Sequence, residues 1–94
     1  MRTRSAAIIV LLATAPAAAQ PAAPAGAAAC SGCHPRAAAA APGVQPLAGR
    51  PAEEIIAAMQ AFRTGERSAT VMDRIAKGFS DEEIRAIAAW MSAQ

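Results

Sequence analysis

The sequence predicts an all-α fold with three main helices and connecting loops. Two segments in the second half carry apolar residues at helical spacing, and each is bounded by residues that favour helix ends. A shorter segment before them carries two cysteines one helical turn apart. No segment alternates apolar and polar residues convincingly at a period of two, which is the pattern of a strand with one buried face.

Residues 1–19 have the features of an export signal. Arg2 and Arg4 precede an apolar stretch that ends near Ala15, and a run of three alanines before Gln20 fits the small-residue cleavage pattern. The apolar stretch is shorter than the roughly 18 residues that a membrane-spanning helix needs. We therefore expect cleavage of the signal, a mature chain without a transmembrane segment and a periplasmic location.

Residues 20–26 are rich in Ala and Pro and are predicted to form a tether, which leaves 27–94 as the only domain. A chain of 94 residues excludes TIM-barrel and Rossmann enzymes on length. Its formal charge is +2, from nine Lys/Arg and seven Asp/Glu. Because Arg2 and Arg4 lie in the signal, the mature chain is neutral, and we expect no nucleic-acid partner.

The domain has few large apolar side chains for its core. Alanine supplies 29 of the 94 residues, aromatic residues supply 3%, and fourteen larger apolar side chains lie from Val44 onward. A small chain of this kind usually needs disulfides, a metal or a large apolar cofactor for stability. Two cysteines can form only one disulfide, so we expect an internal group to complete the core.

The first long helix is predicted to start at Pro51, which suits a first helical position, and to run through Arg63. Gly65 follows as its C-terminal cap. Residues 35–49, which precede the helix, are predicted to form a loop with at most one helical turn. Three residues spaced along one face of the helix form its apolar stripe: Ile55, Met59 and Phe62.

The last helix is predicted to follow Ser80. Ser80 and Glu83 have the spacing of a capping box, and Asp81 and Glu82 add negative charge at the same helix end. Four residues are predicted to form its buried face: Ile84, Ile87, Ala88 and Met91.

The short helix is predicted to start near Ala25 and to carry Cys30 and Cys33. The run Cys30-Ser31-Gly32-Cys33-His34 is the C-x-x-C-H attachment signature of c-type haem. Two thiols one turn apart can add to the two vinyl groups at one porphyrin edge, and the adjacent histidine is then held under the iron. We expect one covalent haem c, with Cys30 and Cys33 as thioether links and His34 as the proximal iron ligand.

Three other interpretations of the two cysteines are weaker. A thioredoxin-like C-x-x-C would need a βαβ context, which the sequence lacks. Structural zinc needs four ligands, whereas the chain has two Cys and one His. A Cys30–Cys33 disulfide would close a very short loop and stabilise the chain little.

The second axial ligand is predicted to be Met72. It lies in the connection between the two long helices, from which a side chain can reach across to the iron. Methionine ligation opposite histidine raises the reduction potential of haem iron and suits electron transfer. Met59 and Met91 fall on apolar helix faces and are predicted to pack in the core. An open or different sixth position is the alternative.

The motif, Met72 and the capped last helix with Trp90 together resemble a small monohaem class I c-type cytochrome. Residues 47–67 and 70–84 resemble more specifically the cytochrome subunit of flavocytochrome c sulfide dehydrogenase. The most specific segments are F-R-x-G-x-R, which starts at Phe62, and M-x-R-I-A-K-G-F-S-D-E-E-I, which starts at Met72. The resemblance covers nearly all of residues 47–94 and the haem motif.

This resemblance implies that residues 27–94 form a cytochrome c domain that is not itself catalytic. It implies that an FAD-containing flavoprotein subunit takes electrons from sulfide and that the haem subunit relays them to a soluble acceptor, such as another cytochrome. The family often has a Pro-x-Leu-Ala-Gly segment, where the backbone near the proline accepts the ring N–H of the proximal histidine. Here the run is Gln45-Pro46-Leu47, and Pro35 follows the haem motif, so the partner of His34 stays unassigned.

Several alternatives remain open at the level of the sequence. The chain could be a free-standing monohaem carrier for another dehydrogenase or an oxidase, a haem-based ligand sensor, or a disulfide carrier. Five basic residues around Met72 could dock an acidic partner, pair with haem propionates or form a solvated rim: Arg50, Arg63, Arg67, Arg74 and Lys77.

Overall fold

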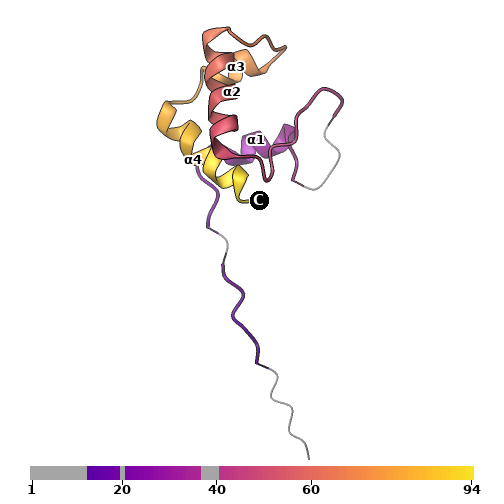
Figure 1. Ribbon diagram of the computed structural model, residues 1–94, viewed down its shortest axis with the longest axis vertical. Coiled ribbons are helices and arrows are strands. Elements are labelled where there is room, and N and C mark those ends of the chain that lie inside the picture. The colour runs from indigo at the N-terminus through magenta and orange to yellow at the C-terminus, as the bar shows by residue number, and fades with distance from the viewer. Residues whose placement is uncertain (1–12, 20, 37–40) are drawn as a thin grey trace, which may run out of the picture.

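A computed structural model of the chain describes residues 13–19, 21–36 and 41–94. Within these ranges the chain forms four helices and no strand, which confirms the predicted all-α class. The helices are α1 (Ala27–Cys33), α2 (Ala52–Thr64), α3 (Met72–Ala76) and α4 (Asp81–Ser92). Helix α2 packs against α3 and α4, and α1 packs against α4 (Figure 1).

Parts of the predicted N-terminal organisation lie outside the described residues. These are most of the predicted signal (1–12), the predicted new N-terminus Gln20, and residues 37–40 of the loop after the motif. Residues 21–24 of the tether have no regular secondary structure and lead into α1. Of the helices in the described ranges, none combines the length and the apolar character that crossing a membrane requires.

Helix α2 follows the predicted pattern at its C-terminal end but starts one residue late. Gly65 adopts φ 81° and its N–H donates to the carbonyl of Phe62, which confirms the predicted cap. Pro51 is not the first helical residue, because its ψ of 131° is extended. It occupies the N-cap position instead, where its carbonyl accepts from the amides of Glu54 and Ile55.

The connection between α2 and α4, in which no helix was predicted, contains the short helix α3. Its five residues span little more than one turn, too few for an apolar period to be recognised. Ala76 of α3 is fully buried, whereas Val71, just before the helix, and Ile75 are exposed. Helix α3 places Met72 at its first position.

Helix α4 begins and packs as predicted. The Ser80 side chain accepts from the Glu83 amide at 3.2 Å, and the Glu83 carboxylate accepts from the Ser80 amide at 2.7 Å. This reciprocal pair satisfies two amides that the first turn would otherwise leave unpaired. The four residues of the predicted face are all buried: Ile84, Ile87, Ala88 and Met91.

Arg63 joins the end of α2 to the start of α4. Its guanidinium donates to the backbone carbonyl of Phe79 and to the carboxylate of Asp81, both at 2.6 Å. A planar guanidinium has several donors in a fixed arrangement, so one side chain can hold two acceptors on adjacent parts of the chain. The F-R-x-G-x-R segment and the start of the last helix therefore meet through this residue.

Small residues set the close contact between α1 and α4. Ala27 and Ala88 are fully buried, and both belong to the buried core cluster together with Ile55, Ile87 and Met91. Gly26 caps α1 with φ 87°, and an added Cβ there would stand 2.6 Å from a ring carbon of Phe79, which precedes α4, and 3.2 Å from Cδ1 of Ile87 in α4. The abundance of alanine thus allows two helices to approach closely, but it contributes little apolar volume.

We expect Gly26→Ala to destabilise the haem-loaded protein by roughly 2–5 kcal/mol, the sum of left-handed strain and overpacking against Phe79. The matched control is Gly65→Ala. Gly65 has a similar φ of 81°, but an added Cβ there meets open space, so the substitution should lower the free energy of unfolding by about 1–2 kcal/mol. Denaturant unfolding followed by circular dichroism measures both. Equal losses at the two positions would show that the α1–α4 contact tolerates a methyl group.

Candidate functional site

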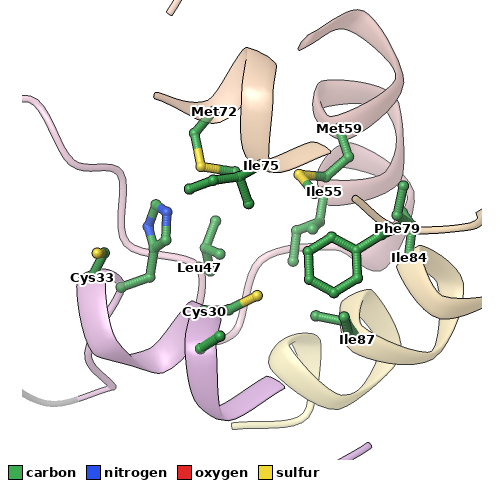
Figure 2. Close-up of a pocket in the computed structure, with 12 residues that line it drawn as sticks. Cys30, Cys33, Leu47, Ile55, Met59, Met72, Ile75, Phe79, Ile84 and Ile87 are labelled. Atoms are coloured by element: carbon green, nitrogen blue, oxygen red, sulfur yellow. The ribbon is translucent and has the colours of Figure 1, made fainter. Parts of the chain in front are cut away.

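An apolar cavity of about 190 Å³ lies among the four helices and the loop that precedes α2. Figure 2 shows side chains from all of these segments facing one space, with Met72 and Cys30 on different sides of it. Except for one histidine and two cysteines, the lining side chains are hydrocarbon or thioether groups. The lining residues are Ala29, Cys30, Cys33, His34, Leu47, Ile55, Met59, Met72, Ile75, Phe79, Ile84 and Ile87.

Helix α1 brings both cysteines to the cavity. Three positions separate Cys30 from Cys33, so the two side chains lie about one turn apart on the same side of α1. Cys30 is half-buried and Cys33 is exposed at the cavity mouth. Burial raises the pKa of the Cys30 thiol; a backbone hydrogen bond opposes this rise and Cys33 adds a smaller one. The interior thiol is therefore held in its neutral form at neutral pH.

His34 directly follows α1 and is oriented by a backbone carbonyl. Its amide donates to the Cys30 carbonyl at 2.8 Å, and its Nδ1 lies 2.6 Å from the carbonyl oxygen of Gln45. A carbonyl oxygen can only accept, so Nδ1 carries the proton and Nε2 keeps a lone pair for a metal. The partner that the sequence analysis left unassigned is thus Gln45, the residue before Pro46. The sequence feature that could have identified Gln45 as the acceptor is its place directly before Pro46.

The three methionines of the predicted domain lie in different surroundings. Met91 is buried in the core cluster, as predicted. Met59 was predicted to pack in the core but lines the cavity instead, where its sulfur and that of Met72 both face the central space (Figure 2). Two thioether groups therefore share a cavity with His34, and the helical pattern alone could not distinguish a cavity wall from a filled core.

The geometry suits a flat, largely apolar group joined to α1 and bound at a metal centre. Two thiols and an oriented imidazole come from one side, and the thioether of Met72 comes from α3. Among the residues that the structure describes, no three His, Cys, Asp or Glu side chains gather as a metal site of their own. The donors present would suit a metal held by a macrocycle, for which His34 and Met72 are the candidate protein ligands.

Residues 17–91 match the family model described as cytochrome C oxidase, cbb3-type, subunit III. The chain belongs to this cytochrome c family. None of the curated proteins compared with the chain matches it. As a cytochrome c domain, the protein carries covalently bound haem c and functions in electron transfer. The apolar lining and the donor residues suit that cofactor, and they agree with the expectation drawn from the C-x-x-C-H motif.

The structure also gives specific contacts to three of the five basic residues noted in the sequence. Arg63 bonds to Phe79 and Asp81 as described above, Arg50 donates to the side-chain oxygen of Gln45 at 3.0 Å, and the Arg67 guanidinium lies 4.9 Å from the centre of the Phe62 ring. Arg74 and Lys77 are exposed. The cytochrome therefore uses much of this basic cluster for internal contacts.

We expect the double variant Cys30→Ala, Cys33→Ala to yield little folded protein, because haem would no longer be held in the cavity and its apolar walls would face water. Ser31→Ala is the matched control, since it lies on the same helix and loses only a hydrogen bond to the Ala27 carbonyl. Far-ultraviolet circular dichroism of the purified proteins measures helix content. A soluble, fully helical double variant would contradict the role of haem in completing the core.

Proposed function

We propose that the cytochrome is a periplasmic relay for single electrons, taking them from a flavoprotein subunit that oxidises sulfide and passing them to a soluble acceptor. The observation that carries the electron-relay part is the cavity in which Cys30, Cys33 and His34 meet a thioether from α3. Export rests on the signal-like residues 1–19. The flavoprotein donor rests on the resemblance of residues 47–67 and 70–84 to the sulfide dehydrogenase subunit.

In this proposal Cys30 and Cys33 form the two thioether links, His34 is the proximal iron ligand and Met72 is the distal one. Haem c, when bound, supplies a one-electron iron couple. The thioether links fix the group to α1, and the hydrogen bond to Gln45 holds the imidazole in one tautomer. The apolar walls, including Ile55 of α2, keep water from the space between α1 and α3.

The two segments that carry the specific resemblance meet at one place in the fold. Arg63, in the first segment, holds both Phe79 and Asp81, in the second. Phe79 lines the cavity, so this contact connects the surface of α2 and α4 to the haem site. This contact supports the proposal because it makes the two segments that carry the resemblance one structural unit beside the cavity.

A second candidate is electron delivery in a terminal oxidase system, as a free-standing carrier or a subunit. It is favoured by the family match over residues 17–91, because that family is described as an oxidase subunit. Both candidates use the same haem site and ligands. They differ in the protein that accompanies the cytochrome, which makes isolation of the native complex the deciding experiment.

We expect Met72→Leu to lower the midpoint potential and to abolish the weak long-wavelength absorption of a sulfur–iron bond, because leucine cannot ligate iron. Met59→Leu is the matched control: it makes the same substitution in the same cavity and should leave that band in place. Redox titration and absorption spectroscopy of the oxidised proteins measure both effects. Persistence of the band in the Met72 variant and its loss in the Met59 variant would reassign the ligand to Met59.

The partner is tested by isolating the tagged cytochrome from the periplasm of its host. We expect about one flavin to accompany each haem, and we expect sulfide to reduce the haem in the isolated complex. Haem and flavin are quantified by their absorption after separation of the subunits. A flavin-free cytochrome that sulfide does not reduce, recovered together with a terminal oxidase, would contradict the first candidate and support the second.

A further inference from the structure

The carbonyl that orients His34 belongs to an exposed loop, not to a helix. Gln45 lies outside all four helices and is exposed. The proline that follows disfavours the helical conformation at Gln45 and so restricts the direction of its carbonyl. Nevertheless, an exposed loop residue needs additional contacts to keep a 2.6 Å hydrogen bond in place, because local motion of the loop would move the carbonyl away from the ring nitrogen.

One backbone hydrogen bond joins the end of this loop to α4, and a second closes a turn within the loop. The Gly49 amide donates to the Met91 carbonyl of α4 at 3.2 Å, and the Arg50 amide donates to the Leu47 carbonyl at 3.1 Å. Gly49 has φ 73°, a left-handed conformation that glycine adopts without strain. The backbone of Arg50 is therefore held at a defined place beside α4 before its side chain makes any contact.

From this fixed position the Arg50 side chain reaches back five residues to Gln45. Its Nη2 donates to the Gln45 Oε1 at 3.0 Å. A hydrogen bond with a charged donor is stronger than one between neutral groups, and the turn that holds Arg50 reduces the entropy that the contact costs. Gln45 is thus held twice, through its side chain by Arg50 and through its backbone carbonyl by His34.

We propose that Arg50 is a positioning residue for His34, acting by holding Gln45, whose backbone carbonyl accepts the His34 Nδ1–H. Arg50 does not touch the imidazole and is not a ligand. Its effect is to keep the acceptor at hydrogen-bond distance. A well-held acceptor fixes the ring orientation and increases the electron-donating power of the imidazole.

The inference rests on the proposed ligation of iron by His34, but not on the identity of the electron donor. It differs from a direct role of Arg50 in pairing with a haem propionate, because that role would not depend on the Gln45 side chain. Loss of the two roles would also shift the midpoint potential of the haem in opposite directions. A weaker hydrogen bond to His34 makes the imidazole a poorer donor and raises the potential, whereas loss of a positive charge near the iron lowers it.

The test uses the haem-loaded protein and four variants: Arg50→Ala, Gln45→Ala, the double variant, and Arg85→Ala as a control. Gln45→Ala keeps the backbone carbonyl and changes no charge. Arg85 is exposed on α4, so its replacement removes one charge without altering any residue of the loop. NMR measures the exchange of the His34 Nδ1–H with deuterated solvent, and redox titration measures the midpoint potential.

We expect Arg50→Ala and Gln45→Ala each to speed this exchange about fivefold, the factor for loss of one ordinary hydrogen bond. The double variant should be no faster than either single variant, the control should be unchanged, and Gln45→Ala should raise the potential. An unchanged exchange rate in Arg50→Ala would overturn the inference. So would an acceleration of exchange in the double variant equal to the product of the accelerations in the two single variants. If the oxidised native protein lacked the paramagnetic shifts of an iron-bound histidine ring, the proposed ligation itself would fail.

Discussion

The helices of this cytochrome enclose a space that their own side chains do not fill, and the rest of the structure depends on that space. The buried core cluster lies where α4 meets α1 and α2, and two of its five members are alanines that add little volume. Ile75 and Phe79 face the cavity instead. Covalent haem c supplies the apolar surface that these walls need, because dispersion contacts are lost wherever a wall has no partner atoms. The cofactor is therefore part of the core as well as the redox group.

The features that the sequence predicted well depend on residues close to one another in the chain. The capping box of Ser80 and Glu83 and the glycine cap at Gly65 each involve atoms within one or two turns, so their geometry follows from residue type and spacing. The clustering of Cys30 with His34 follows in the same way, from their places at the end of α1. These local rules fixed the fold class and one side of the candidate site.

The features that the sequence did not predict depend on contacts between distant parts of the chain. The acceptor of His34 lies eleven positions away in a loop, and only the folded chain brings the two residues together. Met59 lies on an apolar stripe whether it faces a core or a cavity, so its pattern could not reveal the difference. Helix α3 is too short to leave a periodic signal, and Pro51, whose residue type favours the first helical position, lies one position earlier, at the N-cap.

The contact of Ala27 with the α4 core has a consequence for the order in which this protein can be made. Under the export proposed above, the chain crosses the membrane with its N-terminal end first, so α1 reaches the periplasm before α4 does. During that interval the Cys30 sulfur, which the finished fold half-buries, is open to the surrounding solution. A group that is to be joined to this sulfur therefore meets it most easily before the last helix docks.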